Sequence, residues 1–206
     1  SVNQTDYMLK PSDIKYFPQL DYIVTISQIC LNSLYNEFPT LKDRCLLIEN
    51  ICSPKMIKVM AQKGDTYEDN FSGVRLVSMG RFDIHIKGMD IAIKACRILK
   101  SAGIYFHWYW LGEGEQRNQL ETMIREAGAK TNPYNYIKDA DIYIQPSRIE
   151  GKSVALDEVK ALAKPIVVTN FKSVLDQFTN RQNALICDID AKSLSDSIIE
   201  LLNNKE

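Results

Sequence analysis

Two glutamates and two basic residues form the pattern with the clearest chemical meaning in this sequence. Glu150 follows a short apolar run that ends at Pro146, and Glu158 comes eight positions later. Arg81 and Lys87 follow an earlier apolar run. Basic side chains beside a helix N-terminus stabilise a diphosphate, whereas carboxylates accept hydrogen bonds from hydroxyl groups. The four side chains together therefore suit a ligand that carries both a diphosphate and hydroxyl groups.

The elements around the glutamates are expected to hold both at one edge of a sheet. Residues 141–145 predict a buried strand, and residues 153–163 predict a helix with Ser153 as its N-cap. Glu150 then lies on the loop at the carboxyl end of the strand, and Glu158 lies about a turn and a half into the helix. Ligands of open parallel sheets bind at this edge. Taken singly, each glutamate also fits a solvated surface position.

Strands and helices alternate along the second part of the chain. The expected strands are 74–79, 104–111, 141–145, 165–169 and 184–187, and the expected helices are 88–101, 115–127, 153–163, 172–178 and 192–203. This alternation predicts an α/β fold, a Rossmann-like doubly wound parallel sheet. One strand of such a sheet is expected to be missing near residue 130, because only three residues separate Gly128 from Asn132. Either the strand is lost or residues are omitted there.

The first part of the chain reads as a separate unit. Residues 21–26 and 44–49 predict strands, Ser27 is expected to cap a helix between them, and Ser53-Pro54 is expected to start another helix. A polar connector runs from 62 to 73. We therefore expect two domains, residues 1–62 and residues 63–206.

Composition excludes several classes of protein. A net charge of −1 over 206 residues argues against a nucleic-acid partner. No apolar stretch approaches the roughly 20 residues of a membrane span. The five cysteines form no CxxC pair, which favours reduced thiols in a cytoplasmic protein. Two histidines are too few for a metal cluster, and Asp139-Ala140-Asp141 precedes a strand instead of ending one, so we expect no metal site.

Several short blocks resemble one family. They are Pro146-Ser147-Arg148-Ile149-Glu150-Gly151, the spacing to Glu158, the run from Ala161 to Thr169, Gly80-Arg81 with Lys87-Gly88, and Gly112-Glu113-Gly114. Together they resemble the signature of retaining glycosyltransferases of family 4, which have the GT-B fold. The likeness is strong from Val74 to Val168 and corresponds to the carboxyl-terminal, donor-binding domain. Residues 1–62 would then be the end of the amino-terminal, acceptor domain.

The resemblance assigns roles to individual residues. It implies that Glu150 contacts the transferred sugar, that Glu158 holds the nucleotide ribose, and that Arg81 and Lys87 bind and stabilise the diphosphate. The neighbouring residues expected to line the donor site are Gly80, Glu113, Gly151, Lys152 and Ser153. Two departures stand out: Lys152-Ser153 replaces the usual Phe-Pro pair, and the loop from Asn170 to Ser173 lacks the usual glycine.

The implied reaction transfers a sugar from a nucleoside diphosphate sugar, with UDP-sugars as the expected donors, to a hydroxyl acceptor with retained configuration and no metal cofactor. The expected acceptor is a glycan or lipid-linked sugar in polysaccharide or glycolipid synthesis. The expected place is the cytoplasm, at the inner face of the membrane, with peripheral association through a further amino-terminal part. The chain begins at Ser1 and is expected to be an inactive fragment on its own. The alternative is a non-catalytic α/β module that binds a nucleotide or phosphate.

Overall fold

The computed structural model describes residues 15–114, 125–128 and 132–204 and contains two separate parallel sheets. The larger sheet has six strands in the order β5-β4-β3-β6-β7-β8. Their bounds are β3 Val74–Met79, β4 Phe106–Leu111, β5 Arg125–Gly128, β6 Ile142–Gln145, β7 Ile166–Thr169 and β8 Leu185–Cys187. Every neighbouring pair is parallel, as the alternation of strands and helices predicts.

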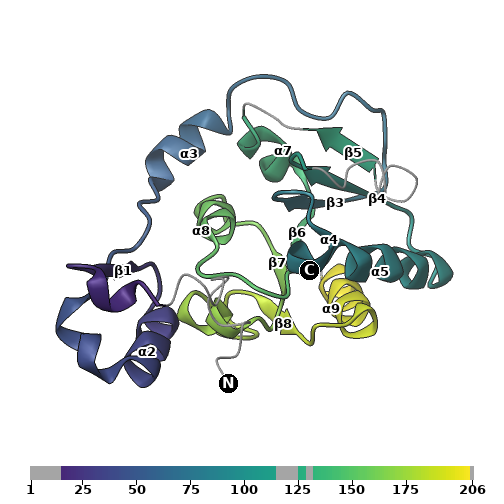
Figure 1. Cartoon of the computed structure of the whole chain (residues 1–206). Coiled ribbons are helices and arrows are strands. Elements are labelled where there is room, and N and C mark those ends of the chain that lie inside the picture. Colours follow the sequence, from purple (N-terminus) through teal and green to yellow (C-terminus); the bar gives the residue numbers. More distant parts are fainter. Residues whose placement is uncertain (1–14, 115–124, 129–131, 205–206) are drawn as a thin grey trace.

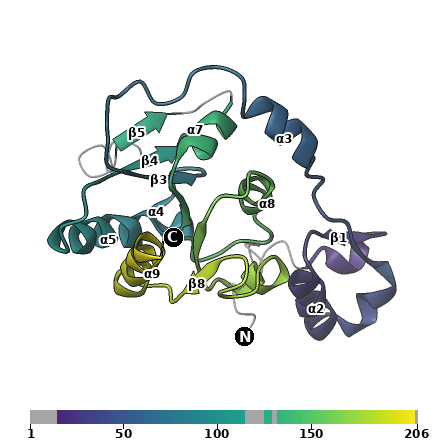
Figure 2. The ribbon, with the colours of Figure 1, turned by 180° about the vertical axis from the view of Figure 1, so that it is seen from behind.

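Helices cover both faces of this sheet. One face packs against α5 (Met89–Ser101) and α9 (Ala191–Asn203), and the other packs against α7 (Tyr134–Asp139) and α8 (Val154–Ala161). Figures 1 and 2 show α5 and α9 together on one side and α8 on the other. Because successive strand residues point to opposite faces, Ile142 and Ile144 join one core and Tyr143 joins the other. The doubly wound fold expected from the sequence is confirmed.

Strand β5 corrects one prediction. The strand expected to be missing near residue 130 is present as Arg125–Gly128, which pairs with β4 at the edge of the sheet. These residues fall at the end of the predicted helix 115–127, so the helix is wrong from residue 125 onward, and residues 115–124 lie outside the described part of the chain. A strand of four residues at the edge of a sheet can form through backbone hydrogen bonds to the neighbouring strand. Its sequence therefore need not show an alternation of apolar residues.

The order of the strands creates a switch point between β3 and β6. These two strands are neighbours, with Leu76 paired to Ile142. The chain leaving β3 enters α4 (Ile84–Lys87) and then α5, whereas the chain leaving β6 enters α8 on the opposite face. The two loops therefore separate at the carboxyl ends of adjacent strands. Open α/β sheets bind ligands in the crevice that forms at such a point.

The first part of the chain forms a smaller unit with a core of its own. It contains the strands β1 (Ile23–Thr25) and β2 (Cys45–Leu47), the helix α2 (Gln28–Glu37) and the short 3-10 helices η1 (Phe17–Gln19) and η2 (Pro39–Arg44). Ser27 caps α2 as predicted, since its Oγ accepts from the Cys30 N–H. The chain then runs through α3 (Pro54–Met60), which contacts α7 and α8.

Candidate functional site

The loop after β3 lies in close contact with the turn after β4. The Gly80 N–H donates to the carbonyl of Leu111, and the indole N–H of Trp110 donates to the carbonyl of Gly80 at 3.1 Å. Gly80 has φ of 153°, and a Cβ at Gly112 would lie 2.0 Å from the Gly80 oxygen. Gly112 is therefore required by the close approach of the two backbones, whereas Gly80 is favoured by its positive φ.

The helix α4 carries Lys87 to the same edge. The sequence pattern does not predict this single turn. Asp83 caps it, because the Asp83 Oδ1 accepts from the N–H groups of His85 and Ile86. Gly88, with φ of 66°, ends it. Lys87 is the last residue of the turn, and its side chain passes over Gly80.

Lys87 and Glu150 form an ion pair across the two loops. The Lys87 Nζ lies 2.7 Å from the Glu150 Oε1. The same oxygen accepts from the Ser147 hydroxyl at 2.7 Å and from the Gln145 amide at 3.0 Å. The Glu150 side chain is only 11% exposed, so all three contacts are largely shielded from water. Together they hold the carboxylate in one orientation.

Gln145 and Ser147 were missed by the sequence reasoning. Gln145 is 4% exposed and is the polar residue that ends an otherwise apolar strand, which is the signal that could have found it. Its amide also donates to the Ser153 hydroxyl at 3.0 Å. Thr169 holds this segment from β7, because its hydroxyl donates to the carbonyl oxygens of Gln145 and Ser147. The donors to Glu150 are thus themselves fixed in place.

The residues that follow Glu150 point in other directions. Ser153 caps α8 as predicted, accepting from the Leu156 N–H, and it is 5% exposed. Lys152 pairs with Glu49 at 2.7 Å. The carbonyl of Gly151 accepts from the thiol of Cys30 on α2 at 3.8 Å. Gly151 and Lys152 therefore contact the smaller unit.

Glu158 lies on α8 in a different environment. Its Oε1 accepts from the Tyr134 hydroxyl at 2.8 Å. Burial raises the pKa of the Glu158 carboxyl, and the Tyr134 bond lowers it by less. Burial, together with the Glu158 carboxylate, raises the pKa of Tyr134 to about 12. Tyr134 is therefore a neutral phenol at neutral pH and is the donor in its hydrogen bond with Glu158.

Tyr143 connects the surroundings of the two glutamates. It is fully buried in β6, and its hydroxyl donates to the carbonyl of Met79 at 3.4 Å. Burial raises the pKa of this phenol, and both Glu150 and Glu158 raise it further. Both carboxylates therefore raise the pKa of the same buried phenol, which lies near the carboxyl ends of the strands.

Arg81 and Glu113 occupy the exposed rim of the two loops. Both residues are exposed, and the Phe82 N–H donates to the carbonyl of Glu113 at 2.9 Å. The structure thus joins Lys87 to Glu150 directly, places Glu158 against Tyr134, and leaves Arg81 on the loop beside Gly80. The ligand contacts of these residues stay predictions.

A cavity of about 420 Å³ opens beside this cluster. Its lining comes from α2, from the loop that carries Glu150 and from the segments after β7 and β8: Ile29, Cys30, Arg148, Ile149, Glu150, Lys172, Ser173 and Ile189. A volume of this size falls in the range of small-molecule sites. Part of the wall is supplied by the smaller unit.

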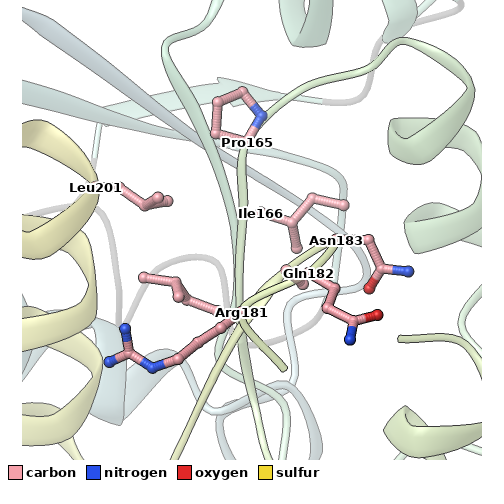
Figure 3. Close-up of a pocket in the computed structure, with 8 residues that line it drawn as sticks. Pro165, Ile166, Arg181, Gln182, Asn183 and Leu201 are labelled. Atoms are coloured by element: carbon pink, nitrogen blue, oxygen red, sulfur yellow. The ribbon is translucent and has the colours of Figure 1, made fainter. Parts of the chain in front are cut away.

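A second cavity, of about 250 Å³, lies at the opposite end of the strands. Figure 3 shows Leu201 on one side of it, Ile166, Gln182 and Asn183 on the other, and Pro165 above. Arg181 borders it and forms a two-pronged ion pair with Glu200, with its Nη1 at 2.6 Å and its Nη2 at 3.0 Å from the carboxylate oxygens. This cavity contains none of the predicted site residues.

Metal-binding and membrane-spanning features were also sought in residues 15–114, 125–128 and 132–204. In these ranges, no group of three or more His, Cys, Asp or Glu side chains could hold a metal ion. None of the helices there combines the length and apolarity that a membrane span requires.

The fold matches solved glycosyltransferases. A variant of TarM from S. aureus, solved with UDP, superposes with a TM-score of 0.74 at 17% identity and covers 93% of this chain and 38% of its own. HepE from Anabaena, also solved with UDP, superposes with a TM-score of 0.70 at 12% identity over 90% of this chain and 55% of its own. These likenesses identify the class of fold as GT-B.

Sequence comparison gives the family. The model "Glycosyl transferases group 1" matches residues 72–206, and the chain belongs to this family. The amylovoran biosynthesis glycosyltransferase AmsK of Erwinia amylovora is 29% identical over 146 residues, which are 62% of this chain and 36% of that protein.

A second relative matches a longer stretch. It is a 4-alpha-N-acetylgalactosaminyltransferase of Campylobacter jejuni whose name specifies a diphospho-undecaprenol substrate, and it is 27% identical over 186 residues, 84% of this chain and 48% of that protein. The chain therefore spans about a third to a half of the length of these curated relatives.

Proposed function

We propose that this chain binds the nucleotide-sugar donor of a retaining glycosyltransferase of family 4. Residues 63–206 would form the donor domain, and residues 1–62 would be the end of the acceptor domain. The observation that carries the proposal is the contact between Lys87 and Glu150 at 2.7 Å. It joins the loops after β3 and β6 at the switch point of the sheet, where α/β folds bind ligands.

The proposed roles follow from charge and position. Lys87 and Arg81 stabilise the diphosphate as negative charge develops on it. Glu150, oriented by three donors, accepts hydrogen bonds from the sugar. Glu158 accepts them from the ribose. The backbone at Gly80 and the rim residue Glu113 complete the donor site around these groups. Gly151, Lys152 and Ser153 support it indirectly, because Gly151 and Lys152 contact the smaller unit and Ser153 caps α8.

The proposed reaction needs no metal cofactor. The bond between the anomeric carbon and the diphosphate oxygen breaks, and a bond from the acceptor hydroxyl oxygen to the same face of that carbon forms. The departing phosphate takes the acceptor proton. The two cations supply the charge that a divalent metal supplies in other transferases.

UDP is the proposed nucleotide, and a glycan or lipid-linked sugar is the proposed acceptor. The proposal for UDP is supported by the solved structures of similar fold that contain it. The proposal for the acceptor is supported by relatives named for amylovoran synthesis and for a diphospho-undecaprenol substrate. Such an acceptor would place the protein in the cytoplasm at the inner membrane face, with the membrane contact made by further residues.

Calorimetry with UDP tests the donor site. Lys87→Ala, Arg81→Ala and Glu158→Ala are each expected to weaken binding about tenfold or more, because hydrogen bonds to charged groups are strong. The control is Glu200→Gln, which removes the ion pair with Arg181 at the far end of the strands. Unchanged affinity in all three variants would refute the donor site. Binding of UDP without any sugar transfer by the complete protein would favour a non-catalytic nucleotide-binding module.

A further inference from the structure

Arg148 joins the two segments that carry Lys87 and Glu150. It lies two residues before Glu150, on the loop that follows β6. Its backbone N–H donates to the carbonyl of Ile86 at 2.8 Å. Its guanidinium Nη1 donates to the carbonyls of Ile84 and His85, both at 3.2 Å. One residue thus satisfies three carbonyls of α4, the turn that ends at Lys87.

These carbonyls need a partner from elsewhere in the chain. The last four carbonyls of an α-helix find no N–H donor within the helix. Because α4 has only four residues, this applies to all of its carbonyls. A single turn is also unstable by itself, because nucleation costs more than one hydrogen bond returns. A cation at the carboxyl end adds a favourable interaction with the helix dipole. Arg148 therefore acts as a C-cap for α4 from a distant part of the sequence.

The same guanidinium also holds the start of the next helix. Its Nη1 and Nη2 bind the two carboxylate oxygens of Asp90, each at 2.7 Å. Asp90 lies in the first turn of α5, and the hydrogen bonds from Arg148 lower the pKa of its carboxyl. A two-pronged pair fixes direction as well as distance, because the guanidinium and carboxylate planes must align.

The backbone at this junction leaves little room for adjustment. Gly88 separates α4 from α5, and a Cβ at this position would lie 1.8 Å from the Pro146 oxygen. The loop after β6 therefore rests directly on the junction. Arg148 and the pair between Lys87 and Glu150 link the same two segments.

We infer that Arg148, held by Asp90, is a positioning residue that keeps Lys87 in reach of Glu150 and of a bound diphosphate. The inference rests on the proposed donor site but concerns different residues. The hydrogen bonds of Arg148 go to the backbone of α4 and to Asp90, so it acts on Lys87 through the backbone of α4. Loss of Arg148 should release the turn that carries the cation.

Hydrogen exchange tests the positioning role without any ligand. Arg148→Gln is expected to raise the exchange rates of amides in residues 84–92 about tenfold, because local opening loses its cap. Asp90→Asn keeps the capping bonds but weakens the pair, so a smaller rise is expected. Glu200→Gln removes a two-pronged arginine pair elsewhere and should leave these amides unchanged. Unchanged exchange in Arg148→Gln, in a protein that melts as the unmodified chain does, would overturn the inference.

A double-mutant cycle with UDP separates positioning from general destabilisation. Arg148→Gln alone should weaken UDP binding about tenfold, and Arg148→Lys, which keeps the positive charge and a single donor nitrogen but not the two-pronged geometry, should recover part of the loss. In a Lys87→Ala background, Arg148→Gln should cost little more, because the residue it positions is gone. An equal loss in both backgrounds would overturn the inference. If exchange rises in residues 84–92 but the unmodified protein binds no UDP, the proposed function fails while the role of Arg148 in holding Lys87 stands.

Discussion

Glu150 and Glu158 are separated by eight positions, yet their carboxylates meet opposite surroundings. One oxygen of Glu150 accepts from an ammonium, a hydroxyl and an amide, all within 3.0 Å. Glu158 accepts from the neutral Tyr134 phenol, and burial raises the pKa of its carboxyl. Glu150 is therefore held in one orientation by the protein, whereas burial disfavours the charged form of Glu158, which additional donors would stabilise.

This difference suits two kinds of ligand group. A carboxylate whose orientation is fixed can distinguish the geometry of one sugar. A carboxylate that is short of donors gains when a pair of hydroxyl groups, such as those of a ribose, replaces water beside it. Substituting each glutamate separately tests whether the two carboxylates serve different parts of the ligand.

The largest effect is expected from Glu150→Gln. The rate of sugar transfer by the complete protein should fall about 100-fold, because a charged group aligned with the reacting sugar is lost. Affinity for UDP should change by less than about threefold, since UDP lacks the transferred sugar that Glu150 is proposed to contact. Transfer assays and calorimetry on the same preparation measure both. A fall in UDP affinity as large as the fall in rate would remove the distinction between the two glutamates.

A smaller effect is expected from Glu158→Gln. Affinity for UDP and for uridine should fall by a similar factor, about tenfold, because both ligands carry the ribose. Lys87→Ala is the matched comparison, since it should weaken UDP but leave uridine unchanged. Competition with both ligands provides the measurement. A Glu158→Gln variant that binds uridine normally would show that the ribose lies elsewhere.

Tyr134→Phe is expected to act only on the Glu158 side. It removes the hydroxyl that donates to Glu158 at 2.8 Å and so leaves a partly buried acceptor without that partner. The free energy of unfolding should fall by about 0.5–1.5 kcal/mol at pH 7, the usual net value of one hydrogen bond. Urea denaturation measures the change. Tyr105→Phe, at a 69% exposed tyrosine, is the control and should be neutral.

The smallest effect concerns the pH dependence of stability. The pKa of Glu158 is raised in the folded chain, so the folded state binds its proton more tightly than the unfolded state does. This contribution is fully present below the unfolded pKa and is lost as pH rises through the raised folded pKa. Glu158→Gln should therefore raise Tm slightly at pH 7, and the gain should vanish near pH 4. The gain is small because water screens a partly exposed carboxylate. A constant Tm difference across this range would contradict the assignment.

The large sheet was predictable because its signals are local. The apolar runs of β3, β6 and β7 are buried on both faces, and caps such as Ser27 and Ser153 mark where helices begin. These features depend on near neighbours in the sequence. The strand boundaries observed for these three strands lie within a residue of the predicted ones.

The short elements could not be predicted in the same way. Strand β5 exists because β4 offers an open edge, and α4 exists because Arg148 satisfies its carbonyls from the loop after β6. Neither cause is visible in the few residues of the element itself. The same holds for Gln145 and Ser147, whose role depends on where Glu150 comes to lie in space.

The sequence predicted the interaction partners of some site residues better than those of others. Lys87 and Glu150 meet because their loops follow β3 and β6, which are neighbours in the sheet, although the sequence did not specify the order of the strands. Lys152 instead pairs with Glu49, a partner in the first part of the chain that no local pattern indicates. The Lys152 side chain points toward the smaller unit because that unit packs against the Glu150 loop.

The contact between Gly88 and the Pro146 carbonyl limits how this site can change over generations. Main-chain atoms that touch cannot be exchanged for others by a point mutation, so position 88 admits a single amino acid. Variation at this edge of the sheet is then expected at exposed side chains such as Arg81 and Glu113, while the backbone contact at Gly88 stays constant.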